Sequence, residues 1–182
     1  CNQGEYNLSF VVSISRLYAE STQGRIKTLS DFTRLAKENY DEAVHLFYSN
    51  NFTNLLKGEK EKLFYKSIRT KPQTAQNVEG FLIACDRKKR VELSLAETGS
   101  CIYEVKDSKK EAVELHRQNW GAVEIQVTSD ADFLIPGKTK LTSNDFIGSV
   151  CPFEYYINHE GMHAGKNFGR LKFEWAYGTL YY

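Results

Sequence analysis

The chain has 182 residues, of which 41% are apolar and 26% are charged. This composition is typical of a globular domain, and a chain of this length buries roughly 70% of the surface that its unfolded form exposes. Its 24 Lys and Arg against 23 Asp and Glu give a net charge of +1, so nothing suggests the clustered positive charge that nucleic acid requires. No apolar run approaches the ~20 residues of a membrane-spanning helix. The composition indicates one domain, no nucleic-acid partner and no transmembrane segment.

The first four residues, Cys1-Asn2-Gln3-Gly4, resemble the start of a mature bacterial lipoprotein, in which the first cysteine carries the lipid. This resemblance implies lipidation of Cys1 and an exported protein anchored in the cell envelope. The alternative is that Cys1 marks an arbitrary boundary within a longer chain. The apolar stretch Tyr6–Leu17 follows, and it fits either a strand or the start of a buried helix.

Two helical stretches are expected next. Apolar residues recur at helical spacing from Phe32 to Tyr48, with Ser30 as the N-cap and Asp31 in the first turn. The second stretch has its apolar side between residues 55 and 68, and Gly58 is expected to break it into two pieces.

Strand patterns dominate the rest of the chain. Short apolar or alternating runs predict strands at 81–85, 90–95, 100–105, 122–127, 146–150 and 170–177, and residues 109–118 are expected to form a short helix. The basic run 87–90 is interpreted as a solvated hairpin turn. The predicted fold is α+β, with N-terminal helices packed on an antiparallel, strand-rich C-terminal half that forms a sandwich or curved sheet. It is expected to be a single domain, 1–182, with a mainly helical part (1–75) and a mainly β part (76–182).

Three cysteines other than Cys1 are expected to be buried free thiols. Cys85 and Cys101 fall on the first and third strands of the predicted meander. Strands on either side of a middle one lie about 9–10 Å apart, against the ~5.5 Å between Cα atoms that a disulfide needs. A bond between these two cysteines is therefore disfavoured, and Cys151 is left without a clear partner.

A short histidine motif, His159-Glu160-Gly161-Met162-His163, offers the ligands of a catalytic zinc site. On a helix, the imidazoles of His159 and His163 would share one face and reach one zinc ion, and Glu160 could act as general base. The motif resembles the HExxH of zinc-dependent metallopeptidases. Pro152 fits the first turn of such a helix and Gly165 its end.

The rest of the zinc-peptidase pattern is incomplete in this sequence. Gly169 stands where a third histidine would be expected, and the nearest downstream carboxylate, Glu174, lies on a predicted strand. Gly161 within the helix costs ~1 kcal/mol relative to Ala. A surface helix or loop that contains two histidines is the alternative interpretation.

An acidic set of residues resembles the later calcium loop of C2 domains. A predicted strand is followed by Asp130-Ala131-Asp132 and then by Asn144-Asp145, and these four acidic or amide side chains are oxygen ligands of the kind that calcium prefers. The resemblance implies an antiparallel sandwich over residues 81–177 and calcium binding by Asp130, Asp132, Asn144 and Asp145. The nine residues 134–142 lie between the two parts where members of the C2 family have a shorter link, and acidic and amide residues are also common in ordinary turns.

The function expected from the sequence is that of a non-enzymatic binding or interaction protein with a protein or membrane-surface partner. No cofactor is expected, although zinc or calcium binding is possible at the two sets of residues above. The alternative is a small zinc-dependent hydrolase that uses His159, Glu160 and His163.

Overall fold

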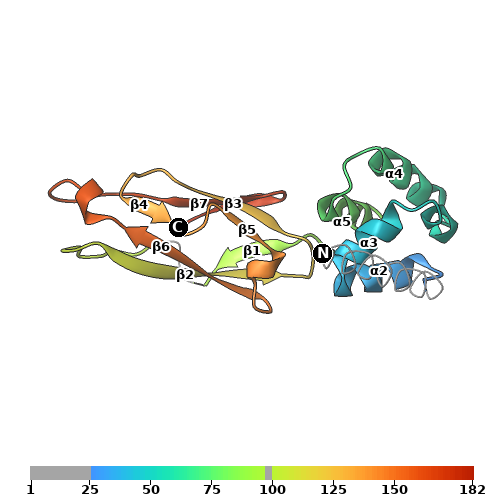
Figure 1. Ribbon diagram of the computed structural model, residues 1–182, viewed down its shortest axis with the longest axis horizontal. Helices are drawn as coiled ribbons and strands as arrows, with labels where there is room; N and C mark the ends of the chain where they lie inside the picture. The colour runs from blue at the N-terminus through green and yellow to red at the C-terminus, as the bar shows by residue number, and fades with distance from the viewer. Residues whose placement is uncertain (1–25, 97–99) are drawn as a thin grey trace, which may run out of the picture. The chain divides into compact units, whose positions relative to one another are not determined.

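The structure, a computed structural model, describes residues 26–96 and 100–182 (Figure 1). It confirms the α+β class, with the helices first and two antiparallel sheets after them. The chain divides into two compact units, Cys1–Lys88 and Lys89–Tyr182, where the sequence predicted a single domain with a helical part that ended at residue 75. Among the described residues, no helix is long and apolar enough to cross a membrane. Cys1 and the stretch Tyr6–Leu17 lie outside the described residues.

The first unit is entirely helical in its described part. Its elements are α2 (Leu29–Glu38), α3 (Tyr40–Phe47), the 3-10 helix η1 (Phe52–Leu55), α4 (Glu59–Arg69) and α5 (Ala75–Ala84). Gly58 is the N-cap of α4, so the second helical stretch is divided at Gly58 as predicted.

The single helix predicted from Phe32 to Tyr48 is in fact two helices. Asn39 has an extended backbone, and its side chain accepts a hydrogen bond from the Glu42 N–H at 3.2 Å, so it ends α2 and caps α3. The cap of α2 is Thr28 rather than Ser30. Its hydroxyl accepts from the Asp31 N–H at 3.1 Å while the Asp31 carboxylate accepts from the Thr28 N–H at 3.1 Å. This reciprocal pair is a capping box, which satisfies two backbone donors at the helix end.

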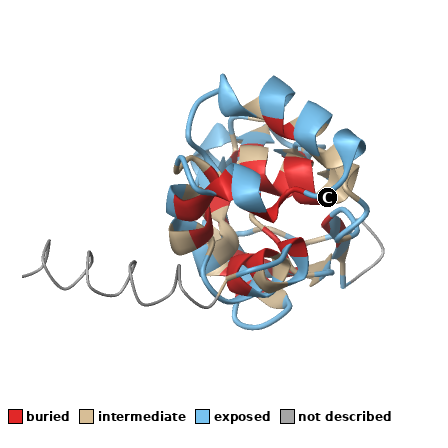
Figure 2. Ribbon diagram, turned by 90° about the vertical axis from the view of Figure 1, so that its right-hand side faces the viewer, coloured by how far each residue is buried: buried red, intermediate tan, exposed pale blue. Residues whose placement is uncertain are grey.

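Buried residues lie on the inner sides of the helices (Figure 2), and aromatic rings form much of the core of the helical unit. The Phe47 ring lies at the centre, with ring centroids 4.7 Å from Phe52, 5.1 Å from Tyr65 and 5.1 Å from Phe81. Most of these pairs are edge-to-face, the geometry that aligns the positive ring edge with a negative ring face. Phe81 was predicted to begin a strand. It lies instead on α5, which Thr74 caps through the Asn77 N–H at 3.3 Å.

A buried ion pair lies at the end of the helical unit. Lys88 Nζ donates to Glu79 Oε1 at 2.6 Å, and the two side chains are 1% and 0% exposed. The Tyr40 hydroxyl donates to the other carboxylate oxygen of Glu79 at 2.8 Å. Burial lowers the pKa of Lys88, and the hydrogen bond to Glu79 opposes that shift. The basic run 87–90 is therefore not a solvated turn at Lys88.

The second unit is a sandwich of two four-stranded antiparallel sheets (Figure 1). One sheet has the order β1-β2-β6-β4, and its strands are β1 (Glu92–Leu95), β2 (Lys109–Gln118), β6 (Val150–Ile157) and β4 (Leu134–Pro136). The other has the order β5-β3-β7-β8, and its strands are β5 (Lys140–Thr142), β3 (Glu124–Ser129), β7 (Leu171–Trp175) and β8 (Gly178–Tyr181). The strands meet face to face through one shared core, in which the Phe153 and Phe173 rings lie 5.0 Å apart and nearly perpendicular.

Besides the strand at 81–85, three predicted elements of the β part are wrong. Residues 109–118 form strand β2 rather than a helix, because Val113 and Leu115 alternate into the core while their neighbours face out. Residues 100–105 form no strand, and residues 146–150 form a turn with a single bridge between Ile147 and Val150. The cysteines in the described residues are free as expected, but only Cys151 is buried.

The buried ion pair gives a first testable prediction. We expect Lys88→Met to lower the free energy of unfolding by about 3–5 kcal/mol, because it removes the cation that pairs with the buried Glu79 carboxylate. The measurement is urea unfolding followed by circular dichroism. The matched control is Lys60→Met, which removes an exposed pair with Asp86 (62% and 83% exposed) and should cost less than about 1 kcal/mol. Equal effects of the two substitutions would contradict the prediction.

Alanine substitutions at two glycines give a second prediction, in which the two changes in stability have opposite signs. A Cβ at Gly137 would lie 2.6 Å from the backbone carbonyl oxygen of Glu154, whereas a Cβ at Gly80 in α5 would meet no atom of the described residues within 4 Å. We expect Gly137→Ala to destabilise the sandwich by about 1–3 kcal/mol through overpacking. Gly80→Ala should instead stabilise α5 by up to ~1 kcal/mol, because alanine loses less backbone entropy in a helix. Thermal unfolding of both variants tests the two signs.

Candidate functional site at the loop end of the sandwich

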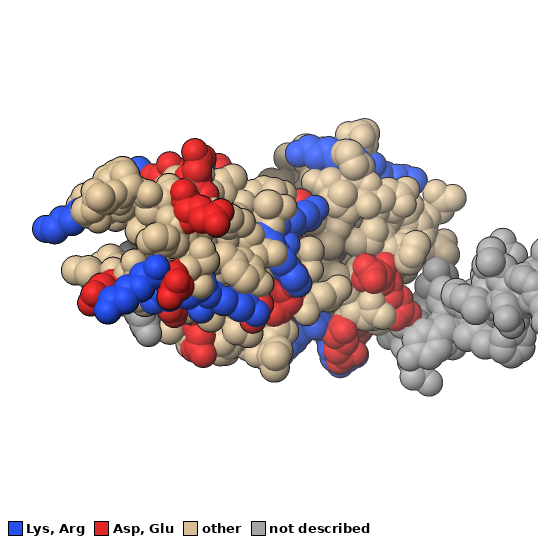
Figure 3. Space-filling view, turned by 60° about the vertical axis from the view of Figure 1, so that its left-hand side comes forward, with Lys and Arg blue, Asp and Glu red and all other residues tan. Residues whose placement is uncertain are grey.

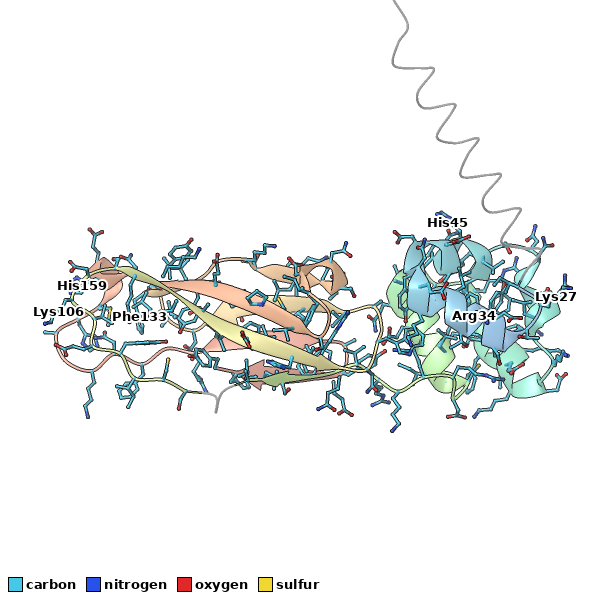
Figure 4. The ribbon with its side chains drawn as sticks, turned by 90° about the horizontal axis from the view of Figure 1, so that it is seen from below. Lys27, Arg34, His45, Lys106, Phe133 and His159 are labelled. Carbon is cyan, nitrogen blue, oxygen red and sulfur yellow. The ribbon has the colours of Figure 1, made fainter. Side chains whose placement is uncertain are left out.

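Three connecting segments meet at one end of the sandwich, and we call residues 101–108, 130–133 and 158–170 the loop end. Hydrogen bonds join them: the Asn158 N–H donates to the Phe133 carbonyl at 2.7 Å, and the His159 N–H donates to the Ser108 hydroxyl at 2.9 Å. Figure 4 shows Lys106, Phe133 and His159 together at this end. Loops held at the end of a sandwich are the usual position of binding residues, since a rigid scaffold positions them.

Asp130 closes the β3–β7 ladder at this end. Its carboxylate accepts from the backbone N–H of Arg170 at 2.6 Å and from the guanidinium Nε at 2.8 Å. These hydrogen bonds to Arg170 hold the pKa of the Asp130 carboxyl below its ordinary value and raise that of the arginine. The Arg170 guanidinium also lies over the Tyr181 ring, 5.6 Å from its centroid. Asp130 therefore joins the segment 130–133 to the segment 158–170.

The histidine motif does not lie on an α-helix. Residues 150–157, where Pro152 was expected to begin a helix, form strand β6, and only His159–Gly161 follow as a 3-10 turn that the Asn158 side chain caps. Met162 is extended, with φ −104° and ψ 150°, so the turn has ended before His163. The helix prediction is wrong because Cys151, Phe153, Tyr155 and Ile157 alternate into the core, a period of two that only a strand satisfies.

His163 belongs to a loop that Asn167 ties together. The Asn167 side chain accepts from the His163 N–H at 3.1 Å and donates to the His163 carbonyl at 2.8 Å. Gly165 lies inside this loop with a positive φ of 101° rather than at the end of a helix. Both His159 and His163 are exposed. Within residues 26–96 and 100–182, no group of three or more His, Cys, Asp or Glu side chains is arranged to hold a metal ion.

The structure separates the four proposed calcium ligands. Asp130 and Asp132 follow the last residue of β3, whereas Asn144 and Asp145 lie beside its first residue, where Glu124 pairs with Thr142. Six residues of β3 span about 20 Å at ~3.3 Å each, so the two pairs cannot share one ion. The prediction that these four residues form one site is wrong.

Asp145 has a structural role where it lies. Its carboxylate pairs with Lys138 and accepts from the Thr142 N–H at 2.8 Å, which caps the 3-10 turn Ser143–Asp145. The hydrogen bond from Lys138 and that from the Thr142 N–H lower the pKa of the Asp145 carboxyl. Glu174, the expected downstream carboxylate of a zinc site, lies toward the end of β7 that is remote from the loop end. There it pairs with Gln126 of β3 and Thr179 of β8, and its carboxylate pairs with Lys172.

The exposed apolar side chains of the loop end belong to none of the motifs that the sequence presents. Phe168 is 84% exposed and Ile102 is 99% exposed. Charged residues of both signs are interspersed on the face of the protein that Figure 3 shows. A large exposed aromatic ring on an ordered loop could have been suspected from the polar sequence around Phe168, Gly-Lys-Asn-Phe-Gly, which offers no neighbouring apolar residue to bury it with.

The fold defines a two-unit α+β protein whose second unit is a β-sandwich with connecting loops joined at one end. The chain belongs to a family described as a family of unknown function (DUF5717), N-terminal, whose model matches residues 1–182. No curated protein and no solved structure matches it.

The geometry of the histidine motif gives a third prediction. We expect protein purified in the presence of zinc to hold less than one equivalent, because the turn ends before His163 and the described residues supply no third ligand beside the two histidines. Metal content is measured by mass spectrometry after dialysis, and His159→Ala should leave both the zinc content and thermal unfolding unchanged. Stoichiometric zinc that disappears in His159→Ala would instead support the hydrolase interpretation, with Glu160 as the base.

Proposed function

We propose that this chain is a non-enzymatic binding protein that contacts a protein partner through the loop end of its sandwich. The observation that carries the proposal is Phe168, an aromatic side chain 84% exposed on a connection whose backbone is held on both sides. Aromatic residues on ordered surfaces dominate the binding energy of many protein interfaces, where they fill a pocket of the partner. No catalytic chemistry is needed for such a role.

The backbone around Phe168 is held in place by its neighbours in sequence. Asn167, directly before it, bonds the carbonyl groups of His163 and Gly165 at 2.8 and 3.3 Å. Arg170, two residues after it, donates to Asp130 through both its backbone N–H and its side chain. Because these bonds order the loop before any partner arrives, binding costs less conformational entropy than it would for a mobile loop.

Gly169, directly after Phe168, lets the backbone of the loop pack closely on the rest of the sandwich. A Cβ at this position would lie 2.9 Å from the Cβ of Ala131 and 3.0 Å from the Phe133 ring, so the backbone of the loop packs directly on the 130–133 connection. At 84% exposure, the Phe168 ring itself takes little part in this packing. This arrangement supports contact with another molecule, since the described residues of the protein leave the ring largely unburied.

Photo-crosslinking tests the proposal in cells of the source organism. A photoreactive phenylalanine analogue in place of Phe168 should yield a crosslinked product of one defined mass, because the partner would lie against that ring. The matched control places the analogue at Ile147, which is 80% exposed but lies at the other end of β6. The partner in the adduct is then purified, and its affinity for the chain should fall at least about tenfold with Phe168→Ala.

The control variants determine what each outcome means. Crosslinking that is equal at residues 147 and 168, or a purified partner that binds Phe168→Ala as tightly as the unaltered chain, would contradict the proposal. Ile147→Ala should leave the affinity unchanged, and thermal unfolding of both alanine variants should match that of the unaltered protein.

A further inference from the structure

Among the described residues, nothing pairs with the outer edge of β2 over half of its length. Arg117 donates its backbone N–H to the carbonyl of Ser149, the residue opposite, at 2.8 Å. Because hydrogen-bonded pairs alternate along an antiparallel ladder, the N–H and C=O groups of all odd-numbered β2 residues point toward β6. Those of even-numbered residues therefore point to the opposite side. There, β1 and Ala96 cover only Glu114 and the residues after it. In the described part of the chain, the N–H and C=O groups of Lys110 and Ala112 have no partner across this edge.

The part of the β6 edge that β4 leaves uncovered lacks a donor. On β6, Glu154 faces away from β2, and its carbonyl accepts from the Gly137 N–H at 2.9 Å. Pro152 is two residues earlier, so its peptide nitrogen is on the same side, beyond the end of β4. Proline has no backbone N–H to donate. Its presence on an exposed strand edge is a common way in which proteins prevent unwanted pairing with another strand. The edge of β2 at Lys110 and Ala112 has no such protection and keeps two donors and two acceptors.

The segment Cys101–Val105 lies against the sandwich through side chains alone. The Tyr103 hydroxyl is 3.1 Å from the Tyr155 hydroxyl of β6, and the Cys101 thiol accepts a hydrogen bond from the Tyr182 hydroxyl at 3.0 Å. Tyr103 and Val105 are partly buried against the core, whereas Ile102 and Glu104 are exposed. The side chains thus alternate as they do in a strand, although the backbone forms no ladder.

One register would bring this segment onto the open edge. With a three-residue connection, 106–108, Glu104 stands opposite Lys110, and Ile102 stands opposite Ala112. Tyr103 then stands opposite Glu111, whose partner on β6 is Tyr155. In this register Tyr103, Glu111 and Tyr155 lie side by side across the sheet. The observed contact between the hydroxyls of Tyr103 and Tyr155 is consistent with that placement. The register also places opposite charges at 104 and 110 and keeps the partly buried residues on the core face.

We infer that Cys101–Val105 docks on the edge of β2 as an added antiparallel strand, in the register that pairs Glu104 with Lys110. The open edge is its docking site, and the tyrosine and thiol contacts hold the segment beside that site while its backbone is unpaired. This inference is independent of the proposed function. It concerns the same chain throughout and requires no partner molecule.

Disulfide trapping tests the register. In a Cys101→Ser background, Glu104→Cys with Lys110→Cys places two thiols on a pair whose Cα atoms would lie about 5.5 Å apart when docked, within the range for a disulfide. The control, Glu104→Cys with Glu114→Cys, moves the second thiol about 13 Å along β2. Under mild oxidation we expect the first pair to form a bond within one chain at least about tenfold faster than the second.

Hydrogen exchange then shows whether the bond captures a true strand. In the oxidised 104–110 protein, exchange of the backbone amides at residues 110 and 112 should slow at least about tenfold, while that of the Glu111 amide, which faces β6, should not change. Equal rates for the two cysteine pairs, a bond between two chains, or unchanged exchange at 110 and 112 would each overturn the inference. Thermal unfolding of the reduced variants confirms that they are folded.

Discussion

The strict alternation of strand β6 is the constraint on which the rest of the sandwich depends. Cys151, Phe153, Tyr155 and Ile157 all point into the core, and a shift of one residue would expose all four and bury the charged or polar residues between them. Because β6 pairs with both β2 and β4, its register also determines theirs. The positions of the connections that meet at the loop end follow from that register.

The same constraint decides what the histidine motif can be. Once residue 157 is the last of a core strand, only a short 3-10 turn fits between it and the loop that Asn167 holds, so His159 and His163 are not presented on one helical face. Side chains that suggest metal ligands in the sequence have other roles here. Asp130 joins two connections through Arg170, and Asp145 caps a turn. Polar residues in turns satisfy backbone groups more often than they bind ions.

The helical unit is held by a different balance of forces. Its core is a cluster of aromatic rings, but it ends on the buried pair of Glu79 and Lys88. Such a pair adds little net stability compared with apolar residues of the same size, yet removal of one partner is costly. The pair therefore ties Lys88, the last residue of the unit, to α5 in one arrangement.

The sequence by itself determined the α+β class, the order of helices before strands and several single features, such as the break at Gly58 and the alternating strands near residues 92, 124 and 171. These follow from local periodicity and backbone preference. Tertiary structure alone decided the segments with ambiguous local signals. Residues 81–84 form a helix because Phe81 packs on Phe47, and residues 109–118 form a strand because β6 offers a partner. The separation of the acidic residues was also invisible in the sequence, since it depends on which ends of β3 the two connections reach.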